Sequence, residues 1–406
     1  MKFEEILGYT DLSVQAFEIV ERKGRGHPDT LADRLAERLS VAYSRFTKDR
    51  AGLILRHQFD KLALMGGRCN VRLGSGEFNS PVRLLLNGRA TPRFGSIELN
   101  FQEPLFRECK NFLESELANF DFSKDCRVIF ETTSNSTRGL VDRFGEPSIN
   151  YRFAPRSAAD IPESSRPLAN DTAVGCGYAP RTGVENLVLS IERSLTSNES
   201  RSVYPWLGTD VKIMACRINS QVEVTLAVPQ ICTHVSSYEQ YEANFQLIQE
   251  KVQDITKGFP EFNVDLHINP SDNIKENSIY LRYTGSCVES GDEGVVGRGN
   301  RIGGVIPSRR AFSIEGLNGK NPAYHAGKLY SVAAWVIANA IWRETGTANE
   351  VFIISQIDRP LDDPWKVIVH SNSKPRNPLV CNIIERVLSR INKITDELLD
   401  GVHELS

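Results

Sequence analysis

The chain has 406 residues, of which 48 are Lys or Arg and 51 are Asp or Glu, so its formal net charge is −3. This near balance gives no general argument for binding nucleic acid or a membrane surface, and an anionic ligand must therefore be bound by local groups. Because a single hydrophobic core seldom grows beyond about 250 to 300 residues, we expect two or three domains or subdomains.

The eight cysteines are scattered, without a C-x-x-C pair or the Cys/His spacing of a zinc site, and we expect them to be reduced thiols. The first residues lack the apolar segment of a signal peptide. No apolar stretch approaches the roughly 18 residues that cross a bilayer. These features predict a cytoplasmic protein without a membrane-spanning helix.

The first third is predicted to contain a helix that follows the His27-Pro28-Asp29 loop. Apolar residues recur at helical spacing from Leu31 to Phe46, which places Asp29 near the helix N-terminus. An anion or a metal-phosphate group could lie at that end. Apolar segments between Gly and Ser turns then predict strands at 52–56, 62–65, 70–73, 82–86 and 127–132, with a helix over 104–117.

The middle third opens with a polar, Pro-rich stretch at 152–167, a candidate linker or mobile loop. Two capping-box patterns then predict helices, the second of which ends near Lys257. The capping pairs are Thr182 with Glu185 and Ser236 with Glu239, and the apolar alternation between the two helices predicts neighbouring antiparallel strands at 211–218 and 222–228.

The last third repeats this scheme of strand pairs followed by helices. It predicts strands at 264–268, 278–283, 351–357 and 366–370, a helix over 322–342 and a closing helix over 379–399. We therefore expect an α+β fold with three pseudo-threefold-related subdomains, each a mixed or antiparallel sheet with helices on one face. The expected portions are 1–150, 151–262 and 263–406, and we expect them to be interleaved in space.

Two clusters of glycines and charged residues indicate a site for a polyphosphate. One joins Ser290-Gly291-Asp292-Glu293-Gly294-Val295-Val296-Gly297-Arg298-Gly299-Asn300 to Gly319-Lys320-Asn321-Pro322-Ala323-Tyr324-His325-Ala326-Gly327-Lys328; the other is Glu21-Arg22-Lys23-Gly24-Arg25-Gly26-His27-Pro28-Asp29. Glycines let the backbone approach a ligand, and the cations supply charge and donors to phosphate oxygens. Asp292 and Glu293 could hold the accompanying cation. Neither cluster is a standard nucleotide loop, and either alone could be a solvated surface turn, but together they favour one composite site.

These segments resemble the archaeal-type S-adenosylmethionine synthetases, in order from about residue 17 to 400. The residues that carry the resemblance are 18–30, Ala169-Asn170-Asp171-Thr172, Gly177-Tyr178-Ala179-Pro180, Gly291-Asp292, Gly297-Arg298-Gly299-Asn300-Arg301 and Gly319-Lys320-Asn321-Pro322. The resemblance implies that the sulfur of L-methionine displaces triphosphate from C5′ of ATP, and that triphosphate is then cleaved to pyrophosphate and phosphate. It also implies Mg²⁺ and K⁺ as cofactors and a homodimer with active sites between the subunits.

The resemblance assigns roles to individual residues. Catalytic roles fall to His27, on the α-phosphate side, and to Arg298 and Lys320, as cations on the triphosphate; Asp29 matches a Mg²⁺ ligand; ATP or phosphate binding falls to Asp171, Asp292, Asn300, His325 and Lys328. Preorganised cations suit this reaction because the leaving triphosphate gains negative charge. Asp33 and Glu37 lie one and two turns beyond Asp29, and either a site role or a solvated acidic stripe fits them.

The chain departs from the family in the region expected to hold the amino-acid substrate. The family segment N-T-D-Q-V-E-L reads Gln58-Phe59-Asp60-Lys61-Leu62-Ala63-Leu64, and G-Q-G-S-M-D reads Ser134-Asn135-Ser136-Thr137-Arg138-Gly139. We assign Asp60, Lys61 and Arg138 to this substrate pocket. A lost carboxylate partner for the methionine ammonium could weaken methionine use.

Three interpretations follow from this departure. The first, which the retained phosphate-binding residues favour, is an ordinary methionine adenosyltransferase. The second is a divergent relative that transfers adenosyl from ATP to another, more acidic nucleophile. The third is a weakly catalytic nucleotide-binding subunit.

Overall fold

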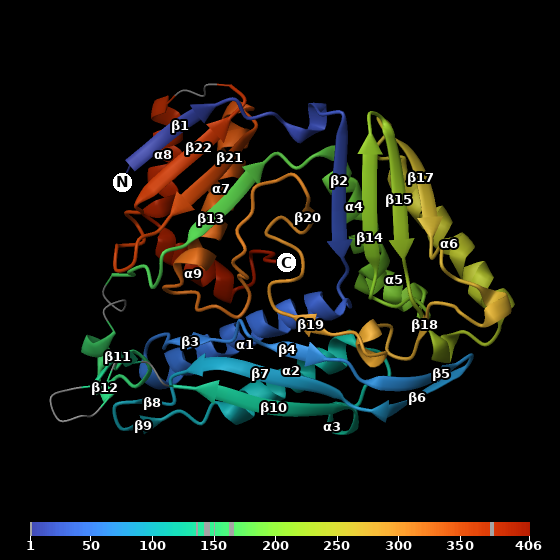
Figure 1. Ribbon diagram of the computed structural model, residues 1–406, viewed down its shortest axis with the longest axis horizontal. Helices are drawn as coiled ribbons and strands as arrows, with labels where there is room; N and C mark the ends of the chain where they lie inside the picture. Colours follow the sequence, from blue (N-terminus) through green and yellow to red (C-terminus); the bar gives the residue numbers. More distant parts are fainter. Residues whose placement is uncertain (1, 135–136, 142–146, 150, 162–165, 374–376) are drawn as a thin grey trace.

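The computed structural model describes the whole chain except residues 1, 135–136, 142–146, 150, 162–165 and 374–376. Its three larger sheets lie on three sides of the molecule in Figure 1, and each combines strands that are far apart in the sequence. The first sheet has the order β1 (Lys2–Leu7), β22 (Lys366–Ser371), β21 (Asn349–Ile354) and β13 (Val174–Ala179). Only β1 and β22 run parallel within it, so the amino-terminal strand completes a carboxy-terminal sheet.

The second and third sheets are mixed in the same way. The second has the order β17 (Asn263–Ile268), β15 (Gln221–Ala227), β14 (Lys212–Ile218), β2 (Phe17–Lys23) and β20 (Ile306–Pro307); the third has β10 (Cys126–Thr133), β7 (Val82–Ala90), β4 (Ala63–Met65) and β19 (Gly294–Val295), with β3 (His57–Gln58) also on β7. Parallel pairs are β15 with β17 and β10 with β7. The expected α+β class with mixed sheets is confirmed.

Smaller elements complete the fold. Two-stranded pairs are β5 (Arg68–Arg72) with β6 (Ser75–Ser80), β8 (Arg93–Phe94) with β9 (Ile97–Glu98), β11 (Thr137–Val141) with β12 (Pro147–Ile149), and β16 (Gln230–Ile231) with β18 (Leu281–Arg282); the two short helices are α3 (Phe122–Asp125) and α5 (Asn198–Val203). Among the described residues of 152–167, the structure has 3-10 turns and no strand of a larger sheet.

Helices cover the buried face of each larger sheet and form its hydrophobic core with it. The first core includes α7 (Ala326–Thr345), α8 (Asn377–Leu388) and α9 (Ile391–Leu399); the second, α4 (Gly183–Thr196) and α6 (Tyr238–Thr256); the third, α1 (Pro28–Ala51) and α2 (Gln102–Glu116). Burial alternates along the central strands, as expected when one sheet face meets helices. No helix in the described part of the chain is long and apolar enough to cross a membrane.

The helix that begins after the His27-Pro28-Asp29 loop is confirmed as α1. His27 is its N-cap, Pro28 is at the first helical position, where its missing N–H costs nothing, and Gly52 ends it in a left-handed conformation. The predicted capping box of Thr182 and Glu185 is confirmed at the start of α4. These local signals succeeded because each depends on neighbouring residues alone.

Several predicted boundaries are wrong. Residues 52–56 form no strand, because the helix cap at Gly52 turns the chain there. Ser237, not Ser236, caps α6, and Ser236 instead bonds the Gln240 side chain. Helix α7 begins at Ala326 rather than 322, the predicted strand at 278–283 is reduced to β18, and the closing helix is broken between α8 and α9.

Candidate active site

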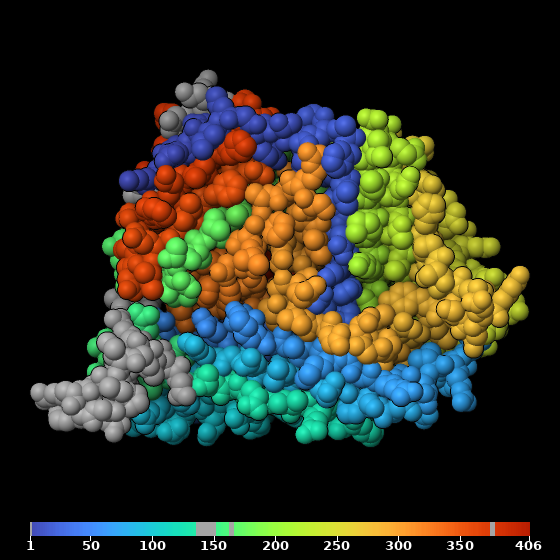
Figure 2. Space-filling view, viewed as in Figure 1, coloured from blue at the N-terminus to red at the C-terminus, as the bar shows by residue number. Residues whose placement is uncertain are grey.

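The segment from 294 to 325 crosses the middle of the molecule between the first sheet, β2 and α1 (orange in Figure 1), and is exposed on the face in Figure 2. Side chains of α1 hold it in place. Asp33 Oδ1 accepts from Gly297 N at 2.8 Å and Asp33 Oδ2 accepts from Gly299 N at 3.2 Å. Glu37 accepts from Gly319 N at 3.1 Å. The segment is therefore a shaped loop, although few of its residues belong to regular structure.

Asp33 and Glu37 are thus loop anchors and not a solvated acidic stripe. Asp33 is 1% exposed, and burial raises the pKa of its carboxyl to about 7. Gly299 must lack a side chain because a Cβ there would lie 2.3 Å from Asp33 Oδ2. The alternative that the sequence left open is settled by burial of the α1 face against the loop.

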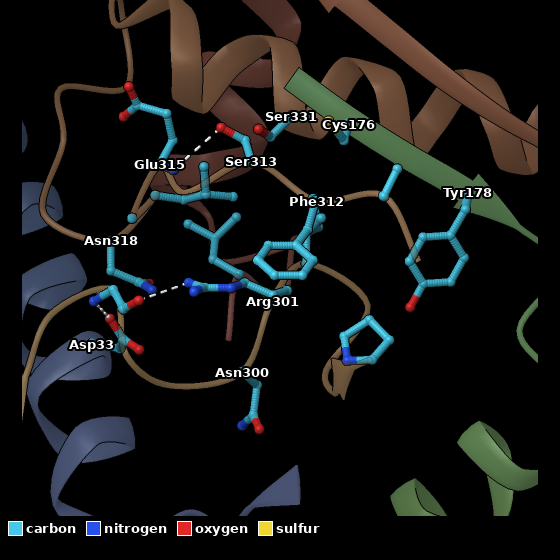
Figure 3. Close-up of a pocket in the computed structure, with 17 residues that line it drawn as sticks. Asp33, Cys176, Tyr178, Asn300, Arg301, Phe312, Ser313, Glu315, Asn318 and Ser331 are labelled. Carbon is cyan, nitrogen blue, oxygen red and sulfur yellow. Dashed lines mark hydrogen bonds between the residues drawn. The ribbon is translucent and has the colours of Figure 1, made fainter. Parts of the chain in front are cut away.

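Asn300 ties the same loop to the end of β2. Its Oδ1 accepts from Lys23 N at 3.0 Å, and its Nδ2 donates to Lys23 O at 2.8 Å. The cavity in Figure 3, below the loop and lined by Asn300, Arg301 and Phe312 among others, has a volume of about 30 Å³. That space suits about one water and is too small for a nucleotide. Asn300 therefore shapes the loop in this structure.

Lys23, His27 and Asp29 form the first charged cluster, at the start of α1. Lys23 Nζ lies 2.8 Å from Asp29 Oδ2 and also donates to Arg298 O at 2.8 Å. Asp29 Oδ1 accepts from Val295 N at 3.0 Å. These bonds bring the two glycine-rich clusters together, as the sequence predicted for a composite site. The Arg298 side chain itself is exposed.

His27 is held as a neutral imidazole. Burial, followed by the charge of Lys23, lowers its pKa to about 4. Its Nδ1 accepts from Asp29 N at 3.2 Å, so the ring proton is on Nε2 and available to a ligand oxygen. His27 lines a cleft of about 460 Å³, the His27 cleft, which is also lined by Asp210, Lys212, Asp272 and Asp292.

Lys320 forms the second charged cluster, with Asp60, Lys61 and Glu315. Lys320 Nζ bonds Glu315 Oε2 and lies 3.9 Å from Asp60 Oδ2, while Lys61 Nζ lies 2.6 Å from Asp60 Oδ2. Burial lowers the pKa of Lys320 to about 8. Phe59 N donates to Gly319 O at 2.8 Å, which places Lys320 beside Asp60.

Asp60, Lys61 and Asp171 line a second cleft of about 460 Å³, the Asp60 cleft. Its remaining lining residues include the cations Arg56, Arg89 and Arg152 and the polar residues Gln58, Asn87, Thr133 and Asn170. The structure thus places two substrate-pocket residues of the sequence prediction next to the predicted nucleotide residue. Arg138 is in β11, but its side chain lies outside the described residues.

Lys328 and His325 are buried at the start of α7. Lys328 Nζ lies 2.6 Å from both Glu37 carboxylate oxygens and donates to Lys320 O at 2.9 Å, so its three donors are used inside the protein. His325 is 5% exposed, and its Nδ1 has no hydrogen-bond partner among the described residues. Burial lowers the pKa of His325 well below its ordinary value.

Three further residues of these clusters were not singled out from the sequence. Lys23 lies inside the basic cluster at residues 21–29, which gave only a weak indication that its side chain belongs to the site. Glu315 lies five residues before its partner Lys320 in an irregular loop, a spacing that gives no local signal. The partner of Asp210 is brought close only by the fold: Asp210 Oδ2 accepts from Cys287 N at 2.7 Å. No pattern of neighbouring residues predicts such long-range contacts.

Asp210 gives a prediction for the pH dependence of stability. Burial raises the pKa of its carboxyl from 3.8 to about 7. Between these values the folded state retains a proton that the unfolded chain has lost, so this group makes stability fall as pH rises. Asp210→Asn keeps an acceptor and removes the titration. We expect the free energy of unfolding of Asp210→Asn, measured in urea and taken relative to wild type, to rise between pH 4.5 and pH 7.5. A difference between the two proteins that stays constant with pH would contradict this prediction.

The fold and these clusters define an α+β protein with two clefts of ionisable residues beside one glycine-rich loop. The family model of S-adenosylmethionine synthetase (AdoMet synthetase) matches residues 4–402. The chain belongs to this family, as the resemblance predicted, and its activity is S-adenosylmethionine synthesis.

Relatives of similar length support this membership. The chain is 35% identical to the S-adenosylmethionine synthase of Pyrobaculum aerophilum over 405 residues (97% of this chain, 96% of the relative) and 34% identical to that of Pyrococcus furiosus over 405 residues (98% and 97%). A solved structure of an unusual S-adenosylmethionine synthetase from Campylobacter jejuni has a TM-score of 0.56 at 13% identity, covering 94% of this chain and 89% of that one. At this identity the likeness concerns the fold alone.

Proposed function

We propose that the His27 cleft and the Asp60 cleft are parts of one active site, in which methionine sulfur attacks C5′ of ATP and triphosphate leaves. The observation that carries this proposal is the loop from 294 to 325. One end is fixed beside Asp29 through Lys23, and the other presents Lys320 beside Asp60. A single ligand with a polyphosphate chain and an adenosyl group fits a site whose charged side chains lie at both ends of one loop.

In this site, Arg298 and Lys320 neutralise the charge that develops on the leaving triphosphate. His27 donates from Nε2 to an oxygen on the α-phosphate side, because its Nδ1 is occupied by Asp29 N. Asp171 and Asp292 are nucleotide-pocket residues, and Asp60 is the carboxylate for the methionine ammonium. Asn300 and Lys328 act mainly by shaping the loop from 294 to 325, the phosphate loop, since both are bonded within the protein. His325, whose buried Nδ1 has no hydrogen-bond partner among the described residues, keeps its proposed role in phosphate binding.

We include Mg²⁺ and K⁺ in the proposal because the S-adenosylmethionine synthetase family generally uses these ions. The described residues contain no group of three or more His, Cys, Asp or Glu side chains that could hold a metal. This fits Mg²⁺, which is usually bound by one or two carboxylates together with substrate phosphates and water. Asp29 would be the protein ligand, exchanging Lys23 for the ion. Bound Mg²⁺ supplies charge neutralisation to the leaving triphosphate.

The proposed assembly is a homodimer with active sites between subunits, built from three pseudo-threefold-related subdomains. Three hydrophobic cores, each between a sheet and its helices, support the subdomains, and the mixed strand orders support interleaving of 1–150, 151–262 and 263–406. Exposed apolar side chains on the second sheet and the phosphate loop, among them Phe17, Ile218 and Ile314, support a subunit contact. Eight free cysteines support a cytoplasmic location.

A second candidate is adenosyl transfer to a more acidic acceptor than methionine. The observation that favours it is the lining of the Asp60 cleft, where Arg56, Lys61, Arg89 and Arg152 outnumber Asp60 and Asp171. In addition, Lys61 already pairs with Asp60 at 2.6 Å, so a substrate ammonium must compete for that carboxylate.

The assay that tests the proposal incubates purified protein with ATP, Mg²⁺, K⁺ and L-methionine, and follows products by mass spectrometry. We expect S-adenosylmethionine, pyrophosphate and phosphate in equal amounts. ATP binding without S-adenosylmethionine, followed by an adenosyl adduct with an acidic acceptor, would favour the second candidate. Omission of methionine is the matched control, because attack on C5′ then has no sulfur nucleophile.

A further inference from the structure

We propose that Glu315 is an internal placeholder anion, which occupies the ammonium of Lys320 in the free protein and is displaced when the polyphosphate binds. This inference rests on the proposed function, in which Lys320 contacts the polyphosphate. It assigns Glu315 a positioning role in the exchange between the free and the liganded site.

The first observation is the contact itself. Lys320 Nζ bonds Glu315 Oε2, and its next carboxylate, Asp60 Oδ2, is 3.9 Å away. Lys320 is 6% exposed, so a ligand phosphate gains its ammonium most directly by taking the place of Glu315. If the carboxylate stayed, it would repel the phosphate oxygens at short range, where charges are poorly screened.

The second observation is the place that the Glu315 carboxylate occupies. A Cβ on Gly327 would lie 3.2 Å from Glu315 Cδ and 3.3 Å from Oε2, so the carboxylate lies against the first turn of α7, a helix of 20 residues. The end of a helix where N–H groups point outward favours an anion. His325, whose buried Nδ1 lacks a partner among the described residues, is the N-cap of this helix.

The third observation is a contrast between two lysines eight residues apart. Lys328 is fully buried and held by Glu37, which α1 supplies and which also accepts from Gly319 N. Lys320 is held by Glu315, whose side chain is 26% exposed and belongs to the irregular loop. Figure 3 shows the Glu315 carboxylate pointing out of the small cavity beneath that loop. The Lys328 pair is thus built into the fold, while Glu315 can be exchanged.

The test measures binding of sodium tripolyphosphate with MgCl₂ by titration calorimetry at fixed ionic strength. For Glu315→Gln, we expect the Kd to fall about ten-fold relative to wild type, which corresponds to ~1.4 kcal/mol, and the KM for ATP to fall with it. Glu315→Asp, which retains the charge, should stay closer to wild type. Glu103→Gln removes one exposed negative charge on α2 and is the matched control; it should leave Kd unchanged.

An unchanged or weaker affinity of Glu315→Gln, with the fold intact by circular dichroism, would overturn the proposal. Weaker binding would mean that Glu315 holds Lys320 ready for phosphate and does not compete with it. If the proposed function is wrong, the result is different, because wild type and every variant would then bind no tripolyphosphate. That result would overturn the placeholder role together with the proposed function.

Discussion

Replacing Lys320 with methionine is expected to lower kcat by about 100- to 1,000-fold, the usual cost of removing one preorganised group that stabilises transition-state charge. Methionine retains most of the side-chain volume and removes the charge. Lys320 belongs to the phosphate loop, and its Nζ lies 3.9 Å from Oδ2 of Asp60, a residue that lines the Asp60 cleft. The measurement is kcat at saturating ATP and methionine.

This variant should also lose some stability, which the sequence alone would not indicate. Lys320 is 6% exposed, and its removal leaves Glu315 without its cation. Because Glu315 is partly exposed and can be rehydrated, we expect a loss of about 1–2 kcal/mol in urea unfolding. Lys257→Met is the matched control, since Lys257 is an exposed cation that lines neither the His27 cleft nor the Asp60 cleft. A kcat of Lys320→Met within a few-fold of wild type would remove Lys320 from the catalytic assignment.

The sequence predicted elements whose signals are local and missed those that depend on distant partners. The spacing from Leu31 to Phe46 gave α1, and Thr182 with Glu185 gave the start of α4. Strand β13 was missed because its glycines weaken strand propensity. They are needed for packing: a Cβ on Gly175 or Gly177 would lie 2.2–2.3 Å from the backbone of α7. Pairing of β1 with β22 joins residues 2–7 to residues 366–371, which no local pattern indicates.

The same limit applies to the site. Residue type and order predicted His27, Asp29 and Lys320 as site residues, and the fold places them along the phosphate loop. Residue type and local pattern do not separate Lys320 from Lys328, since both follow glycines in one motif, and only the family resemblance gave them different roles. Only the fold brings Glu37, 291 positions away, to the Lys328 ammonium. Burial and long-range pairing therefore decide which cation a ligand can reach.

The remaining prediction separates the structural and chemical roles of His27. Its Nδ1 caps α1 by accepting from Asp29 N at 3.2 Å, while Nε2 is the proposed donor to the ligand. Asparagine is a favourable N-cap residue whose amide oxygen can take over the first role, but it lacks a donor at the position of Nε2. His27→Asn should therefore lower kcat by about 100- to 1,000-fold, with the free energy of unfolding within about 0.5 kcal/mol of wild type.

His27→Ala removes both roles, so it should lose activity similarly and also about 1 kcal/mol of stability through the missing cap. Comparing the two variants by kcat and by urea unfolding assigns the activity loss to the ring and the stability loss to the cap. Near-normal kcat in His27→Asn would instead mean that His27 serves the site only by ending the loop and starting α1. The Lys23–Asp29 pair and the Arg298 segment would then carry the phosphate chemistry at this end of the site.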